Sequence, residues 1–238
     1  MHRLFCFMAV MAFTALGAEN SKEKPNPLLS LERLYGKSEF STKSYGVKWL
    51  EAGKGYVRLE KSKAIKDAQD IVRVDPETGK REILVAAKVL IPEGKKKSLA
   101  VSGYTFTKDL EKVLIYTNTR RVWRVHSRGD YWVLDRASGK LHQLGGKEAS
   151  EATLMFAKFS PTNSNRVAYV REKNVYVEDL ATGQIKVLTK RSRDTVINGT
   201  FDWVYEEELG LRDGFRWSPD GKRIAYWQMD EEGVKEMH

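Results

Sequence analysis

The sequence predicts an all-β chain made of repeated antiparallel strand units. Short segments rich in β-branched and aromatic residues recur along the chain, glycine-containing turns separate them, and two sequence templates repeat in tandem. The strand segments are GYVRLE, DIVRVD, KVLIYTN, DYWVLD, RVAYVRE, NVYVEDL, IKVLT and RIAYWQMD. A period of 3.6 residues is almost absent, and we expect one short helix over residues 30–36, capped by Ser30 and ended by Gly36.

The first 18 residues have the pattern of a signal peptide. A short basic start precedes an apolar run over residues 4–16, and small residues favour cleavage after Gly17 or Ala18. That run is too short for a membrane span, which needs about 20 residues. The single cysteine, Cys6, lies inside this segment, so the mature chain would lack a thiol. We therefore expect a secreted or periplasmic protein in which residues 19–45 form a polar linker with the short helix.

Two templates repeat through the rest of the chain. In the first, an aspartate ends a strand, a turn with glycine follows, and a second strand returns; it occurs at 74–84, 134–144 and 178–188. In the second, an aromatic residue leads through a polar turn into a strand; it occurs at 157–170 and 215–227, with a looser copy at 103–117. Such a four-stranded repeat is typical of a β-propeller blade. We expect residues 46–238 to form an incomplete propeller of about three to four blades. Because a propeller closes with about 4–8 blades, this count favours a fragment of a longer protein.

Composition excludes several function classes. The net charge of +9 comes from lysines and arginines scattered through the chain, and the densest runs, at 94–98 and 190–194, are predicted to be solvated turns. Nucleic-acid binding is therefore not expected. The four histidines have no metal-ligand spacing, so neither a metal nor another cofactor is expected.

One stretch does not fit an ordinary surface loop. Residues 201–210 read FDWVYEEELG, with Glu206, Glu207 and Glu208 in a row beside large aromatic residues. Adjacent carboxylates repel one another, and a cation between them would relieve that repulsion. The alternative is a solvated acidic face without a ligand.

Specific motifs resemble the N-terminal propeller domain of the dipeptidyl peptidase IV family of serine exopeptidases. DWVYEEE at 202–208 is the most specific match, VWR followed by RGDYWVLD at 122–135 is the second, and WSPDGKRIAYWQMD at 217–230 follows in order. The resemblance covers about residues 30–238. It implies a domain that binds peptides through their free N-terminus, for release of X-Pro or X-Ala dipeptides by a catalytic domain.

The resemblance also assigns roles to individual residues. It implies that Glu207 and Glu208 bind the α-ammonium of a peptide, and that Arg124 holds a peptide carbonyl. Glu206 would support the turn. The motif's remaining members would either support the environment of the glutamates or serve only in packing; they are Asp202, Trp203 and Tyr205. For Arg124, an ordinary surface ion pair is the competing interpretation.

The sequence also departs from that family's full pattern. No G-x-S-x-G motif is present, so we expect the Ser-Asp-His machinery to belong to an α/β-hydrolase domain outside this chain, and the chain alone to be inactive. A homodimer of the full-length form is one expectation for the assembly. The alternative function is a non-catalytic periplasmic propeller that binds a protein partner. A G-x-S-x-G motif downstream in frame would favour the enzyme.

Overall fold

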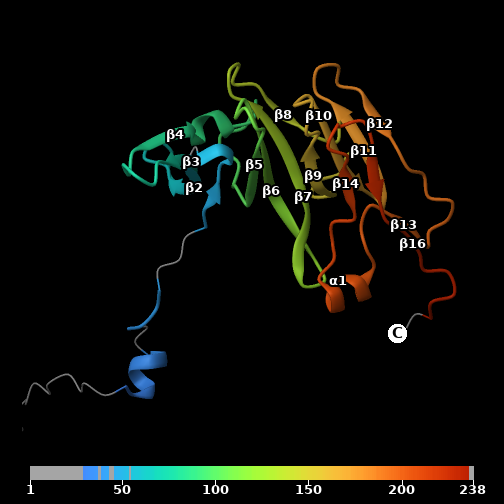
Figure 1. Cartoon of the computed structure of the whole chain (residues 1–238), viewed down its shortest axis with the longest axis horizontal. Coiled ribbons are helices and arrows are strands. Elements are labelled where there is room, and N and C mark those ends of the chain that lie inside the picture. The colour runs from blue at the N-terminus through green and yellow to red at the C-terminus, as the bar shows by residue number, and fades with distance from the viewer. Residues whose placement is uncertain (1–28, 37–38, 43–45, 54, 236–238) are drawn as a thin grey trace, which may run out of the picture. The chain divides into compact units, whose positions relative to one another are not determined.

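The computed structural model describes all residues except 1–28, 37–38, 43–45, 54 and 236–238 (Figure 1). The chain divides into two compact units, Met1–Ser44 and Tyr45–His238. The predicted signal peptide lies outside the described residues, as does part of the predicted linker. No helix within the described ranges is long and apolar enough to cross a membrane.

The first unit contains a single described helix, η1 (Glu32–Gly36), of the π type. The Ser30 hydroxyl accepts a hydrogen bond from Arg33 N at 3.2 Å, and Ser30 O accepts one from Leu34 N at 2.9 Å. Ser30 therefore caps this helix as the sequence predicts, although the helix begins two residues later than expected.

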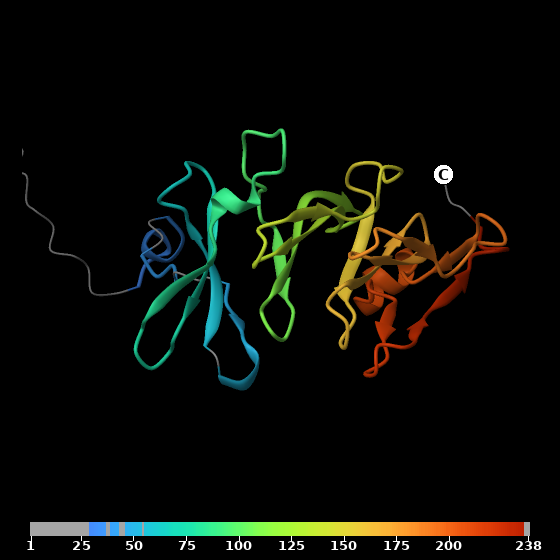
Figure 2. The ribbon, with the colours of Figure 1, turned by 90° about the horizontal axis from the view of Figure 1, so that it is seen from above.

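The second unit is all-β, and its strands form antiparallel groups that follow one another along the chain (Figure 2). The first two groups are four-stranded. The first comprises β1 (Lys48–Trp49), β2 (Tyr56–Lys61), β3 (Gln69–Val74) and β4 (Arg81–Val85). The second comprises β5 (Gly103–Phe106), β6 (Lys112–Val122), β7 (Val125–Asp135) and β8 (Leu141–Gln143).

A third four-stranded group and a fourth, smaller one complete the unit. The third comprises β9 (Leu154–Phe159), β10 (Arg166–Arg171), β11 (Asn174–Asp179) and β12 (Ile185–Val187). It joins the second group through one residue pair, Gly129 with Leu154. The fourth comprises β13 (Val196–Asn198), β14 (Phe215–Trp217), β15 (Ile224–Tyr226) and β16 (Gln228–Asp230). Two 3-10 turns, η2 (Glu51–Gly53) and η3 (Ala87–Leu90), lie in the first half of the unit. The predicted all-β, blade-like architecture is confirmed.

The first sequence template corresponds to one repeated turn. Asp75, Asp135 and Asp179 each accept hydrogen bonds on Oδ1 from backbone N–H groups two or three residues later, at 2.8–3.1 Å. The glycine that closes each turn has a positive φ of 68–74°. These three turns are equivalent, which explains why aspartate and glycine recur at fixed spacing.

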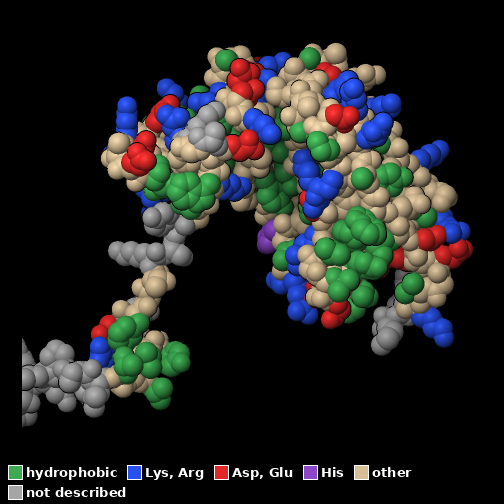
Figure 3. Space-filling model, in the orientation of Figure 1, with side chains coloured by type: hydrophobic (Ala, Val, Ile, Leu, Met, Phe, Trp, Pro, Cys, Tyr) green, Lys and Arg blue, Asp and Glu red, His purple; other side chains and the backbone are tan. Residues whose placement is uncertain are grey.

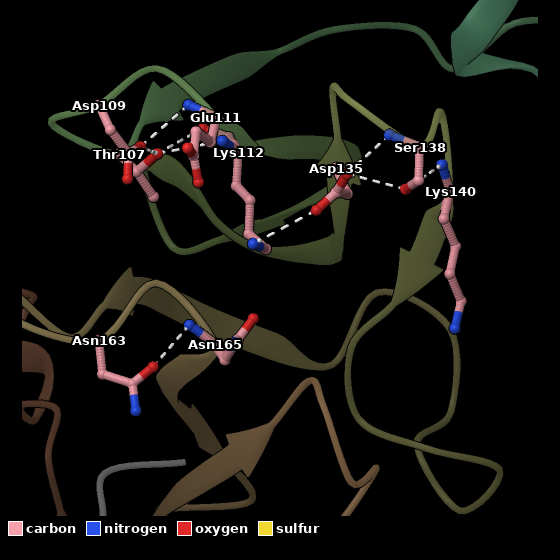
Figure 4. Close-up of polar contacts among 9 residues, drawn as sticks. All are labelled: Thr107, Asp109, Glu111, Lys112, Asp135, Ser138, Lys140, Asn163 and Asn165. Atoms are coloured by element: carbon pink, nitrogen blue, oxygen red, sulfur yellow. Dashed lines mark hydrogen bonds and ion pairs between the residues drawn. The ribbon is translucent and has the colours of Figure 1, made fainter.

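Two copies of the second template, at 103–117 and 215–227, share one turn, drawn in Figure 4 for the β5–β6 connection. In the copy at 157–170 the Ser160 hydroxyl has no hydrogen-bond partner. Thr107 Oγ1 donates to Asp109 Oδ1 at 2.5 Å and accepts from Lys112 N at 3.0 Å. Ser218 and Asp220 make the same contacts before β15, at 2.6 Å between them and 2.9 Å from Arg223 N to Ser218 Oγ. The looser copy at 103–117 is therefore a true structural repeat.

The core lies between successive strand groups. On β6, Val113 and Ile115 face a cluster shared with the first group, whereas Leu114 faces a cluster shared with the third. On β10, Val167 faces the second group and Ala168 faces a cluster that includes Phe215 of β14. Both faces of the middle groups are thus buried, as stacking of blades requires.

Two features of the fourth group differ from the sequence prediction. The predicted strand 223–230 is split, because Trp227 N donates to Gly214 O and Trp227 O accepts from Gly199 N, both at 2.9 Å. Its halves therefore pair with β14 and β13 separately. The second feature is an α-helix, α1 (Trp203–Leu209), where no helix was expected.

Candidate functional site

Helix α1 carries all three glutamates, and its ends have well-defined caps. Asp202 Oδ1 accepts from Tyr205 N at 2.9 Å. At the other end Gly210 has a left-handed φ of 65°, and Leu211 N donates to Tyr205 O at 3.0 Å. Asp202 is therefore an N-cap, and the glycine at 210 ends the helix. At seven residues the helix is too short to give a clear 3.6-residue period, but this pair of caps was a signal in the sequence.

The two ends of the segment that contains α1 lie next to each other, at residues 199–200 and 213–214. Gly214 N donates to Gly199 O at 3.1 Å, and Thr200 forms a β-bridge with Asp213. A Cβ on Gly214 would lie 2.8 Å from the carbonyl carbon of Gly199, so a side chain cannot be added there without backbone movement. The closely packed ends fix the base of the helical segment.

Arg124 lies at the tip of the long β6–β7 hairpin. The ladder continues to the pair Val122–Val125, which leaves Trp123 and Arg124 as the two turn residues. Trp123 has a positive φ of 50°, and its carbonyl accepts from Arg121 Nε at 2.9 Å. The hairpin tip is therefore held in a strained conformation that projects Arg124.

The structure brings Arg124 and Glu207 together. Arg124 Nε forms an ion pair with Glu207 Oε2, and the Glu207 side chain is 3% exposed whereas that of Arg124 is 76% exposed. The contact joins the second strand group to the segment inside the fourth. Because one partner is buried and the other is not, the pair is asymmetric: Glu207 depends on Arg124 far more than Arg124 depends on Glu207.

Glu206 and Glu208 have different surroundings. The Glu206 side chain is buried, and its Oε1 lies 3.3 Å from Arg212 Nε without hydrogen-bond geometry. The interaction is thus an ion pair through charge alone. Glu208 is exposed. Two of the three consecutive carboxylates are therefore buried, each beside a different arginine, and the third is exposed.

The aromatic residues of the motif divide into packing and exposed members. Tyr205 stacks on buried Phe201 with ring centroids 5.5 Å apart. Trp203 is 50% exposed. Hydrophobic side chains gather near α1 (Figure 3), and those exposed in this segment are Trp203, Val204, Leu209 and Leu211.

A cavity of about 320 Å³ lies beside the helix. Its lining includes Trp123 from the hairpin, Met155 from β9, and Phe201 and Glu206 from the helical segment. Arg124, Glu207 and Glu208 are outside this lining. Within the described ranges, no group of three or more His, Cys, Asp or Glu side chains could hold a metal ion.

Sequence reasoning missed two residues that support this site. Arg212 pairs with Glu206, and Lys158 contacts Asp213 at the base of the helical segment at 2.5 Å. Arg212 and Asp213 stand directly after the helix in the sequence LRDG, which was a usable signal. Lys158 lies in β9, and nothing in the local sequence connects it to the helix.

The fold and this geometry define a blade-repeat β protein that presents a carboxylate-rich helix next to an arginine-bearing hairpin. The family model of the dipeptidyl peptidase IV N-terminal region matches residues 107–238. The chain belongs to this family.

Individual dipeptidyl peptidases are also similar to this chain in sequence or in fold. Dipeptidyl aminopeptidase B of Saccharomyces cerevisiae is 35% identical over 156 residues, which covers 65% of this chain and 18% of the relative. Dipeptidyl peptidase 4 of Trichophyton rubrum is 31% identical over 210 residues, covering 88% and 25% respectively. The crystal structure of Porphyromonas gingivalis dipeptidyl peptidase 4 has a similar fold, with a TM-score of 0.71 at 24% identity over 88% of this chain and 29% of that chain. The chain thus spans about a quarter or less of the length of these curated relatives.

Proposed function

We propose that this domain recognises the free N-terminus of peptide substrates for a dipeptidyl peptidase. The observation that carries the proposal is the approach of Arg124 to Glu207, whose neighbour in the sequence, Glu208, has an exposed side chain. A cationic hydrogen-bond donor and a buried carboxylate from distant parts of the chain meet at one place. Such a group can receive the charged α-ammonium and a neutral carbonyl oxygen at the N-terminal end of a peptide.

The chemistry of a peptide N-terminus matches these groups. Its α-ammonium has three N–H donors, and carboxylates accept charge-assisted hydrogen bonds. Glu208 is accessible to an incoming ammonium, and Glu207 already stabilises a cation, the guanidinium of Arg124. Because the Arg124 side chain is largely exposed, it can turn toward a peptide carbonyl while the ammonium takes its place at Glu207.

The remaining parts of the proposal follow from the family. The relatives that match are named as dipeptidyl peptidases and aminopeptidases. Peptide-bond cleavage would belong to an α/β-hydrolase domain that acts on the dipeptide held here, and a homodimer is the proposed form of that longer protein. We also propose export through the signal-peptide pattern of residues 1–18.

The proposal is tested by peptide binding. A tripeptide with glycine first and proline second, either with a free N-terminus or N-acetylated, is titrated into the 238-residue chain by calorimetry. We expect the free peptide to bind more tightly. Glu208→Gln should reduce that preference by about ten- to a hundredfold, because one charge-assisted hydrogen bond is worth about 1.5–3 kcal/mol.

Glu111→Gln is the matched control, since Glu111 is an exposed glutamate on the β5–β6 turn (Figure 4). It should leave the preference unchanged. Equal binding of the free and acetylated peptides by the wild-type chain would reject recognition of the ammonium. That result would favour the second candidate, a propeller that binds a protein partner through another surface.

A further inference from the structure

The base of the α1 segment is held by a partly buried lysine from another strand group. Lys158, on β9, places its ammonium 2.5 Å from Asp213 Oδ1 and 3.0 Å from Phe156 O. It also lies 3.5 Å from the centre of the Phe215 ring. These contacts fix the ammonium from three sides, and the Lys158 side chain is 25% exposed.

Asp213 connects this lysine to the helical segment. It forms the bridge with Thr200, and Thr200 Oγ1 donates to Arg212 O at 3.0 Å. Thr200 precedes the N-cap Asp202 by two residues, and Arg212 pairs with Glu206. A shift of Asp213 would therefore move both ends of the segment that carries the glutamates.

We propose that Lys158 is a positioning residue for the glutamate helix: through Asp213 it fixes the base of α1, and with it the orientation of Glu207 and Glu208. The inference rests on the proposed function, in which the orientation of Glu207 and Glu208 determines how a peptide N-terminus is bound. It adds a residue from β9, outside both motifs of the site.

The protonation of Lys158 supports this role. Burial lowers the pKa of the Lys158 ammonium to about 8, Asp213 acts in the opposite direction, and Arg216 lowers the pKa further. Arg216 also forms an ion pair with Asp213 Oδ2 at 3.0 Å. From β7, Tyr131 accepts a hydrogen bond from Phe156 N on its hydroxyl oxygen at 3.1 Å, and burial raises the pKa of Tyr131. Lys158 is thus the group at this place whose charge changes between pH 7 and 9.

Titration of Lys158 is expected to change the global stability and the local order of α1 in opposite directions. The pKa of Lys158 is lower in the folded chain than its ordinary value of 10.5. Between these two values the unfolded chain binds the proton more tightly, so titration of Lys158 raises global stability as the pH increases. Over the same range the neutral amine loses its charge-assisted bond to Asp213. Local order of α1 is therefore expected to fall as global stability gains.

The test is hydrogen exchange of the backbone amides of residues 203–211 in the 238-residue chain. At pH 7, Lys158→Met should lower their protection factors about tenfold, the scale of a local opening, with a melting temperature close to that of the wild type. In the wild type the same protection should fall between pH 7 and 9. Lys158→Arg, which stays charged, should retain it at both pH values.

Lys112→Met is the matched control, because Lys112 forms a comparable pair with Asp135 at 3.3 Å in the second strand group (Figure 4). It should leave the exchange of α1 unchanged. Unaltered protection in Lys158→Met, or an equal loss in Lys112→Met, would overturn the inference. A wild-type chain that binds no peptide would reject the proposed function and leave the exchange result standing, so the two failures can be told apart.

Discussion

Arg124 and Glu207 form an ion pair in which the carboxylate is almost fully buried and the guanidinium is largely exposed. The pair connects the tip of the β6–β7 hairpin to helix α1. It is the contact that brings residues of two separate sequence motifs together. Its asymmetry predicts how each partner responds to substitution.

Arg124→Ala should destabilise the chain, because it leaves the buried Glu207 carboxylate without its cation. The expected loss in the free energy of unfolding is about 1–3 kcal/mol, because a buried carboxylate loses the counter-charge beside it. Urea unfolding of the purified chain measures it. Arg120→Ala removes an exposed arginine from the same hairpin and should change stability by less than about 0.5 kcal/mol. Equal losses in both variants would contradict a specific role for the pair.

A second buried carboxylate links the second and third strand groups. The Glu178 side chain is 1% exposed and accepts from Gly145 N at 2.9 Å and Tyr169 Oη at 3.2 Å, with His142 Nε2 at 2.6 Å. Burial, followed by the charge of Glu178, raises the pKa of Tyr169, so its hydroxyl remains a donor at alkaline pH.

Glu178→Ala should therefore lower the free energy of unfolding by about 2–5 kcal/mol, since buried donors lose their acceptor. Thermal and urea unfolding provide the measurement. Glu82→Ala, which removes a 50% exposed partner of Arg73, should cost at most about 1 kcal/mol. If Glu178→Ala unfolds like the wild type, the interface between these groups does not depend on this carboxylate.

The repeated aspartate turns predict a specific acid response. Hydrogen bonds from the backbone N–H and the hydroxyl of Ser138 lower the pKa of Asp135 from 3.8 to about 2. A carboxylate with a lowered folded pKa contributes stability above the unfolded pKa and loses it as the pH falls through the folded pKa. The stability difference between wild type and Asp135→Asn should be constant above about pH 5 and shrink between about pH 4 and 2.

Unfolding curves at several pH values measure this difference. Ser138→Ala removes the hydroxyl donor while leaving the backbone N–H in place, so it should reduce the pH-dependent part without abolishing it. A difference that stays flat down to pH 2 would show that the turn does not stabilise the charged form of Asp135.

The strands and the turns of this chain could be predicted because their causes are local. Alternation on β6 and the Asp-to-Gly spacing of turns such as that at Asp75 are written in adjacent residues. Helix α1 was not predicted, because seven residues give too short a period and aromatic residues at its start also favour strands.

The site was only partly predictable, because its contacts join residues that are distant in the sequence. Glu207 and Arg124 were identified as candidates through their motifs, but their mutual contact depends on how the strand groups pack. The pairing of Lys158 with Asp213, 55 residues apart, has no local signature at all. Contacts that close long loops are set by tertiary structure and cannot be found from periodicity.

The three neighbouring glutamates should respond differently to the same substitution. Glu206 is buried beside Arg212, Glu207 is buried beside Arg124, and Glu208 is exposed. Glu206→Gln removes a buried charge from its pair, so it should reduce the free energy of unfolding with little direct effect on peptide affinity. Glu208→Gln should reduce affinity for a free N-terminus at unchanged stability, because an exposed carboxylate contributes little to folding. Glu207→Gln should reduce both.

The measurements are urea unfolding and titration with the free and N-acetylated tripeptides, made on all three variants. The decisive comparison is between Glu206 and Glu208: if their variants lose stability and affinity in the same proportion, the triplet acts as a single acidic surface, and the assignment of separate roles to its members is wrong.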